Sequence, residues 1–360
     1  MELVLVTTFI LSIIFISILI KYAEFFGLQD VPNGRSSHKK QMPRSAGLGF
    51  VTAALLSLLV FDLSHLLEYY YIYLSVLFIT LIGVYDDKFN MSHRLKFIFI
   101  ILIAIFVSLN GINIENFGTY FGYSFAVPML IAVPFTVFAI VGFTNALNLM
   151  DGLDGLAGGL ALIMLVTFFL IGLEHNDSFL ITLSSVFAVT VFAFLLFNWF
   201  PAKIFMGDSG SLSLGFVIAI LSIKSLAYIT PSAVLFIVAL PLIDTFIVMK
   251  RRLQRGLSPF VADKNHLHHF IYKTKLHVKF SVILLLAIQL AFSLIGFQMG
   301  QTNEILSLVL FGVMLFIFLN LFDQRFRYRE PKKKKKKKSK KLKIMGTITS
   351  KKEEVVANDA

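Results

Sequence analysis

The chain of 360 residues contains no cysteine, a single tryptophan and only 15% charged residues. The absence of cysteine excludes a disulfide-rich scaffold. Charged residues make up about 25% of an average globular domain, so the low content here excludes an ordinary soluble protein. Hydrophobic residues reach 57%, with 39 phenylalanines, which also excludes a disordered or collagen-like chain.

Apolar runs near the ~20 residues needed to cross a bilayer recur along the sequence. Eleven such runs are present, at 3–20, 47–67, 69–84, 97–109, 126–143, 157–173, 179–197, 211–229, 232–248, 280–298 and 305–322. The sequence therefore predicts an all-α, polytopic integral membrane protein with about 11 transmembrane helices.

The basic residues predict the orientation of these spans. Alternate connections, at 21–46, 85–96, 144–156, 198–210, 249–279 and 323–360, contain 32 of the 33 lysines and arginines, and the remaining one, Lys224, lies within an apolar run. Such asymmetry marks the cytoplasmic side of a membrane protein. We expect the N-terminus outside and the C-terminus in the cytoplasm. Membrane topology therefore explains the formal net charge of +12, which does not indicate binding of nucleic acid.

The composition changes after the last apolar run. Residues 1–322 are expected to form one transmembrane domain with a site at its cytoplasmic face, and residues 323–360 a polybasic cytoplasmic tail that includes Lys332–Lys338. Such a charge run does not fold by itself. The favoured interpretation is a plain topology anchor. The alternative is attraction to anionic membrane lipids, at roughly 1 kcal/mol per charge near the surface.

Acidic and amide side chains gather at the predicted cytoplasmic ends of the spans. Asp86 and Asp87 end one span, with Lys96 about two turns later. Adjacent acids on a helix point in different directions, so one can face a metal while the other faces a partner. The alternative for this pair is a solvated helix end.

A second polar segment repeats every third residue, at Asn145, Asn148, Asp151 and Asp154. Each step of three residues falls about 60° short of a full helical turn. The segment must therefore be surrounded by protein or water, or unwind at Gly152 and Gly155. Amide and carboxylate oxygens suit a hard cation such as Mg²⁺, and no lysine or arginine lies within the segment to neutralise it.

Two further segments suggest phosphate binding. Asp208 and Ser209 stand between glycines at the start of a span, where free backbone N–H groups favour an oxyanion, although an ordinary helix cap is an equal alternative. The loop 249–279 combines basic residues with His266, His268 and His269, which could bind a diphosphate. The topology rule explains the basic residues of this loop but not the three histidines.

All four segments lie at the same predicted membrane face. Together they indicate metal-assisted phosphoryl chemistry on a substrate that is reached from the cytosol. An ion-coupled transporter, a lipid-phosphate hydrolase and a non-catalytic scaffold are the alternatives. Transporter sites lie near the membrane midplane, whereas these acids lie at span ends.

These segments, in this order, resemble the polyprenyl-phosphate N-acetylhexosamine-1-phosphate transferase family, which includes the WecA-, TagO- and MraY-like enzymes. The resemblance covers residues 1–322 and rests on Asp30–Arg35, Ser37–Lys39, Pro43–Arg44, Asp86–Asp87, Asn145–Leu156, Met206–Ser211 and His266–His269. The order His-Leu-His-His is similar to the WecA and TagO branch. One departure is Ser45-Ala46-Gly47, where the family commonly has a glycine pair after Pro-Arg-x.

The resemblance implies a bacterial multi-pass enzyme of the inner membrane. It would transfer an N-acetylhexosamine-1-phosphate from a UDP-sugar to undecaprenyl phosphate, the initiating step of a cell-envelope glycopolymer, with Mg²⁺ as cofactor and Mn²⁺ able to replace it. A homodimer is compatible with this expectation. Transfer in one step and transfer through a covalent phospho-aspartate remain open alternatives.

The resemblance also implies roles for individual residues. Asn148 and Asp208 would bind the metal, and Asp86 and Asp87 would orient or deprotonate the lipid phosphate. The substrates would be bound by a further set of residues: His38, Lys39, Lys96, Asn145, Asp151, Asp154, His266, His268 and His269.

Overall fold

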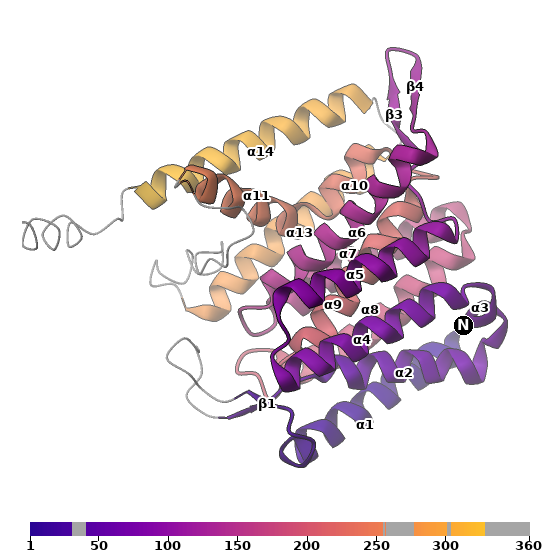
Figure 1. Cartoon of the computed structure of the whole chain (residues 1–360), viewed down its shortest axis with the longest axis vertical. Helices are drawn as coiled ribbons and strands as arrows, with labels where there is room; N and C mark the ends of the chain where they lie inside the picture. The colour runs from indigo at the N-terminus through magenta and orange to yellow at the C-terminus, as the bar shows by residue number, and fades with distance from the viewer. Residues whose placement is uncertain (31–40, 255, 257–276, 301–303, 328–360) are drawn as a thin grey trace, which may run out of the picture. The chain divides into compact units, whose positions relative to one another are not determined.

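The computed structural model describes residues 1–30, 41–254, 256, 277–300 and 304–327, and this part of the chain is mostly helical (Figure 1). The helices are α1 (Glu2–Phe26), α2 (Ala46–Phe61), α3 (Leu63–Glu68), α4 (Tyr70–Phe89), α5 (His93–Leu109), α6 (Met129–Met150), α7 (Leu156–His175), α8 (Ser178–Asn198), α9 (Gly207–Ser225), α10 (Pro231–Ile237), α11 (Ala239–Gln254), α13 (Val278–Met299) and α14 (Glu304–Arg327). Contacts divide the chain into two compact units, Met1–Leu315 and Phe316–Ala360, and the packing below concerns the first.

Most of each of the eleven predicted apolar runs lies on a helix or on a pair of consecutive helices. Among the described residues, six helices are long and apolar enough to cross a membrane, or seven if the bent pair α10 and α11 counts as one span. The chain is therefore a helical, multi-pass membrane protein. The total of 11 spans and their orientation stay predictions.

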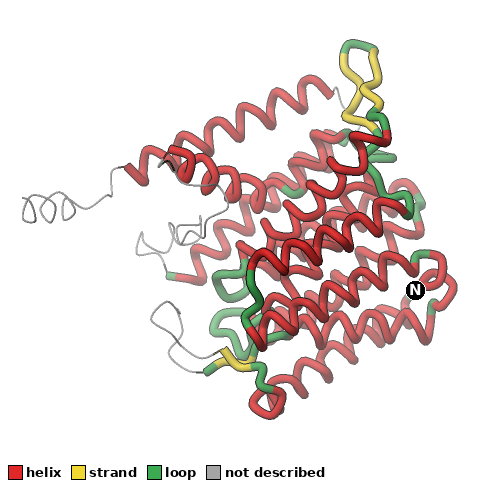
Figure 2. Tube along the Cα trace, in the orientation of Figure 1, coloured by secondary structure: helices red, strands yellow, loops and turns green. Residues whose placement is uncertain are grey.

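Two short antiparallel ribbons connect helices and were not predicted. Strand β1 (Gln29–Asp30) pairs with β2 (Met42–Pro43), and β3 (Asn116–Tyr120) pairs with β4 (Tyr123–Ala126). Figure 2 shows the two ribbons at opposite ends of the helices. The end that carries β1 and β2 is also the end that carries the acidic segments.

Helix α9 is the most enclosed of the candidate spans. In its most apolar stretch 89% of the residues are buried, against 28% in α1, although its mean hydropathy is the lowest of the six. A helix that touches protein on all sides need not be uniformly apolar. Four serines of α9, Ser209, Ser211, Ser213 and Ser225, are accordingly buried.

Glycines allow two helices to approach the first turn of α9. A Cβ atom on Gly47 of α2 would lie 2.0 Å from the Gly210 backbone nitrogen, and one on Gly83 of α4 would lie 2.4 Å from the Ser209 backbone. Small residues that permit such contacts are common where membrane helices pack. This close packing fixes the start of α9 beside the ends of α2 and α4.

The predicted span at 232–248 is broken, with an angle of 85° between α10 and α11. Pro241 lacks the N–H group that would bond the carbonyl of Ile237 four residues earlier. The buried side chain of Gln289, on α13, donates from its Nε2 to that carbonyl at 2.6 Å and accepts from the Leu240 N–H at 3.2 Å. Gln289 therefore stabilises the break by satisfying backbone groups that the helix leaves unpaired.

Candidate active site

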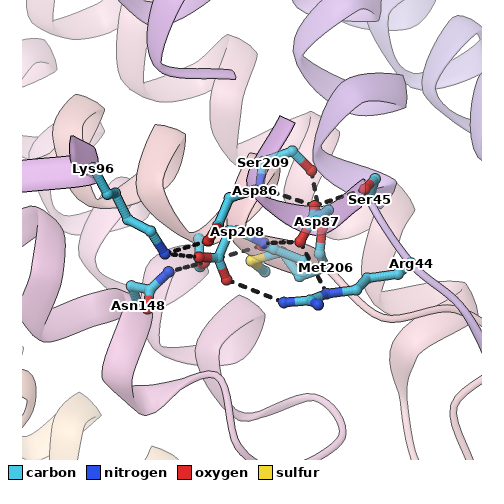
Figure 3. A network of polar contacts seen from close by, with 11 residues as sticks. Arg44, Ser45, Asp86, Asp87, Lys96, Asn148, Met206, Asp208 and Ser209 are labelled. Carbon is cyan, nitrogen blue, oxygen red and sulfur yellow. Dashed lines mark hydrogen bonds and ion pairs between the residues drawn. The ribbon is translucent and has the colours of Figure 1, made fainter. Parts of the chain in front are cut away.

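Four helix ends meet where the acidic segments converge. They are the C-terminal ends of α4 and α6 and the N-terminal ends of α5 and α9. Figure 3 shows the side chains from these ends pointing toward one another. The segment before α2 completes the cluster with Arg44 and Ser45.

Asp87 is the most enclosed acid of the cluster, with a side chain that is 0% exposed. Its Oδ1 accepts from the backbone N–H of Asp208 at 2.8 Å and pairs with the Nε of Arg44 at 2.9 Å. Its Oδ2 accepts from the Ser45 hydroxyl at 2.6 Å and from the backbone N–H of Ser209 at 3.2 Å. The N–H groups at the start of α9 thus bind a carboxylate of the chain, which caps the helix, and not a phosphate.

Asp208 and Asp86 share a cation. The ammonium group of Lys96 pairs with one oxygen of each carboxylate. The second oxygen of Asp208 pairs with the guanidinium of Arg44 at 3.2 Å. The two adjacent acids of α4 therefore diverge, Asp86 toward Lys96 and Asp87 toward α9.

Asn148 lies close to Asp208. Its amide nitrogen donates to the Ser211 hydroxyl at 3.0 Å, and Ser211 stands three residues after Asp208 on α9. Residues three apart on a helix are neighbours, so Asn148 and Asp208 can contact one small ligand (Figure 3). Asn145 lies three residues earlier on α6 and is partly buried.

The chain leaves the helical conformation after Met150, which is the second of the two alternatives that the sequence left open for this segment. Asp154 accepts from the backbone N–H of Ala202 at 3.0 Å, and the N–H of Gly155 donates to Asn198 at 2.9 Å. Asp154 thus ties the turn after α6 to the loop before α9. In the same turn Asp151 is partly buried.

The electrostatic balance of the cluster is negative. Burial raises the pKa of Asp151 to about 7, and the carboxylate of Asp208 adds to that effect while Arg44 opposes it. Burial alone would lower the pKa of Arg44, but the carboxylates of Asp87 and Asp208 outweigh it and raise that pKa. An added cation would lower the pKa of Asp151 and relieve the repulsion among these acids.

The donor set suits a magnesium ion in its chemistry. Among the described residues no group of three or more acidic, histidine or cysteine side chains forms a metal-binding cluster. Magnesium, however, is usually held by one or two carboxylates and keeps several waters. The carboxylate of Asp208, which now pairs with the Lys96 ammonium, and the amide of Asn148 meet that requirement.

Five of the predicted site residues lie outside the described residues, namely His38, Lys39, His266, His268 and His269. The remaining eight belong to the cluster or to the turn beside it. Sequence reasoning gave no role to Arg44 or Ser45, although both stand in or next to a motif. Ser45 contacts Asp87, which is 42 positions away in the sequence, and Arg44 contacts Asp208, which is 164 positions away. No local sequence pattern indicates such contacts.

Ser45 provides a test of this network, because its backbone is left-handed, with φ of 70°. Ser45→Ala removes the bond to the Asp87 carboxylate, and we expect a loss of about 1.5–3 kcal/mol of stability. Ser45→Gly removes the same bond but relieves about 1 kcal/mol of backbone strain. Thermal unfolding in detergent should therefore rank wild type above Ser45→Gly above Ser45→Ala. The reverse order of the two variants would contradict the conformation at this position.

The fold and the site together define a multi-pass membrane protein with an oxygen-rich, anionic site at one end of its helices. Residues 69–226 match the family model described as glycosyl transferase family 4. The chain is 32% identical over 333 residues to a "Probable undecaprenyl-phosphate N-acetylglucosaminyl 1-phosphate transferase" of Bacillus subtilis (strain 168), covering 88% of this chain and 90% of that protein.

Enterobacterial relatives are similar over the same extent. The chain is 29% identical over 331 residues to the "Undecaprenyl-phosphate alpha-N-acetylglucosaminyl 1-phosphate transferase" of Yersinia pestis, and 30% identical over 335 residues to the protein of that name in Salmonella typhi. Each comparison covers 88% of both chains. This chain belongs to the polyprenyl-phosphate N-acetylhexosamine-1-phosphate transferase family, in its WecA- and TagO-like group, as its motifs indicated.

Proposed function

We propose that this protein transfers N-acetylglucosamine-1-phosphate from UDP-N-acetylglucosamine to undecaprenyl phosphate, releasing UMP. The observation that carries the proposal is the likeness, over 88% of the chain, to relatives whose names state this reaction. The cluster around Asp208 supports it, because acids, an amide and two cations suit a metal-bound diphosphate. The product would begin a cell-envelope glycopolymer.

In this proposal Asp208 and Asn148 hold Mg²⁺, which would neutralise the diphosphate and stabilise the departing UMP. Lys96 and Arg44 pair with carboxylates in the structure, and both side chains retain some exposure, at 12% and 25%. Lys96 would bind a substrate phosphate oxygen once Mg²⁺ replaces it as the counter-charge of Asp208, while Arg44 would stay paired with Asp87. Asp86 would orient the lipid phosphate.

A strong general base is not required in this reaction. A phosphate monoester has its second pKa near about 6, so the attacking lipid phosphate is largely ionised at neutral pH. We infer a one-step, in-line attack on the β-phosphorus of the nucleotide sugar. Exchange of labelled UMP into the nucleotide sugar without lipid would indicate the covalent alternative.

We infer 11 spans in a bacterial inner membrane, with the cluster at the cytoplasmic face. The distribution of lysine and arginine supports this orientation. UDP-sugars are cytosolic substrates, which is consistent with a site on that side. Reporter fusions to the connections at 85–96 and 110–128 should fall on opposite sides, and fusions on the same side would reject the topology.

The purified protein should release UMP when given Mg²⁺, undecaprenyl phosphate and UDP-N-acetylglucosamine, because all three are required by the proposed transfer. EDTA should abolish the release, and added Mg²⁺ or Mn²⁺ should restore it. A panel of other UDP-N-acetylhexosamines would define the sugar. The control omits undecaprenyl phosphate and should yield no UMP.

The same assay separates the alternatives. Inorganic phosphate in place of UMP would favour a lipid-phosphate hydrolase. Solute uptake into proteoliposomes without formation of a sugar lipid would favour a transporter. Either result would overturn the proposal.

A further inference from the structure

We propose that Asp87 is a positioning residue, and that its carboxylate caps α9 and thereby directs the side chain of Asp208 into the site. The proposal deepens the proposed function, on which it rests, by dividing the roles of the adjacent acids Asp86 and Asp87. The family resemblance assigned both to the lipid phosphate.

The first argument is that the acceptor capacity of Asp87 is used up. An ionised carboxylate has about four lone-pair positions on its two oxygens. Asp87 receives four partners, from Arg44, Ser45 and the backbone N–H groups of Asp208 and Ser209, at 2.6 to 3.2 Å. No position remains for a proton of the lipid phosphate or for a metal ion.

The second argument is enclosure. The side chain of Asp87 is 0% exposed, whereas the side chains of Asp86 and Asp208 are 10% and 15% exposed. A Cβ atom on Gly207 would lie 2.4 Å from the Oδ2 of Asp87, so the chain passes directly over this carboxylate. A substrate can reach Asp86 and Asp208 without reaching Asp87.

The third argument is how Asp87 acts on Asp208. Asp87 binds the backbone N–H of Asp208, which lies in the first turn of α9, where N–H groups have no partner within the helix. Arg44 then spans both carboxylates, with its Nε on Asp87 and a terminal nitrogen on Asp208. Backbone and side chain of Asp208 are both fixed relative to Asp87 (Figure 3).

The experiment compares Asp87→Asn with Asp86→Asn, which are adjacent, isosteric changes of the same charge. Three quantities are measured on each purified variant: the Tm in detergent, the affinity for Mn²⁺ by electron paramagnetic resonance, and UMP release. The first two require neither UDP-sugar nor lipid. A wild type that binds Mn²⁺ but releases no UMP would therefore reject the proposed function and leave this inference standing.

For Asp87→Asn we expect the Tm to fall by about 5 °C or more, since an amide cannot accept four hydrogen bonds at this place. Mn²⁺ affinity should fall by about 10–100-fold, the usual effect of losing the partner of a metal ligand. Turnover should be partly recovered at high metal concentration. Asp86→Asn should lose turnover with a Tm within about 2 °C of wild type, because fewer buried contacts depend on it.

Loss of turnover in Asp87→Asn with unchanged Tm and unchanged Mn²⁺ affinity would overturn the inference, because Asp87 would then contact substrate. Unchanged values of all three quantities, or a wild type that binds no Mn²⁺, would overturn it as well. If Asp87→Asn does not fold, Ser45→Ala replaces it, since it removes one of the four partners. Ser45→Ala is expected to lose less Mn²⁺ affinity than Asp87→Asn. An unchanged Mn²⁺ affinity in Ser45→Ala would contradict the inference.

Discussion

An Asp208→Asn variant is expected to lose UMP release by about a thousandfold or more while remaining folded. Asparagine keeps the size of the side chain and one acceptor oxygen, which can serve Arg44 or Lys96 but not both, because each contacts a different oxygen of Asp208 in the structure. It removes the negative charge that would hold a divalent metal. A loss of ~4 kcal/mol of transition-state stabilisation, typical for the Lewis-acid contribution of a metal, corresponds to that factor.

The control is Glu115→Gln, which makes the same chemical change in an exposed acid at the far end of the helices, beside β3. It should keep wild-type turnover. Both variants should elute as single species and unfold near the wild-type temperature. Near-normal turnover in Asp208→Asn would remove this residue from the proposed metal site.

Gly83→Ala is expected to have the largest effect on folding. Its methyl group would lie 2.4 Å from backbone atoms of Ser209, which cannot move without displacing α9. Separation of α4 from α9 would also break the contacts of Asp87, which lies one turn further along α4. We expect a loss of more than about 3 kcal/mol, seen as a lower Tm and as aggregated protein on size-exclusion chromatography.

Gly142→Ala is the matched control. This glycine also lies inside a helix, α6, but a Cβ atom there would meet no heavy atom within 4 Å. Stability should be unchanged or higher by up to about 1 kcal/mol, because alanine favours the helix. Similar behaviour of the two variants would argue against the close contact of α4 with α9.

The long helices were predictable because they coincide with apolar runs, and burial in lipid or protein dominates the free energy of such segments. The break near Pro241 was not predicted. Proline alone does not decide the outcome, since α6 continues through Pro134. What differs near Pro241 is that the carbonyl of Ile237, which a continuous helix would have bonded, has a partner 52 residues further along the chain, Gln289.

The composition of the candidate site was predictable, and its connections were not. Clustered acids at span ends are costly unless they are paired, so Asp86, Asp87 and Asp208 were identifiable from their positions. The identity of their partners depends on which helix ends meet. The sequence left an oxyanion site and an ordinary helix cap as equal alternatives for the first N–H groups of α9, and only the structure shows that Asp87 supplies the acceptor.

The dependence of the α10–α11 break on Gln289 has a consequence for biogenesis. The carbonyl of Ile237 and the N–H of Leu240 acquire their partner only from α13, which is synthesised later. Unpaired backbone groups cost several kcal/mol in hydrocarbon. During insertion by the translocon, this segment would therefore stay less bent or more hydrated than in the finished protein. The bend between α10 and α11 would form only after the ribosome has synthesised Gln289.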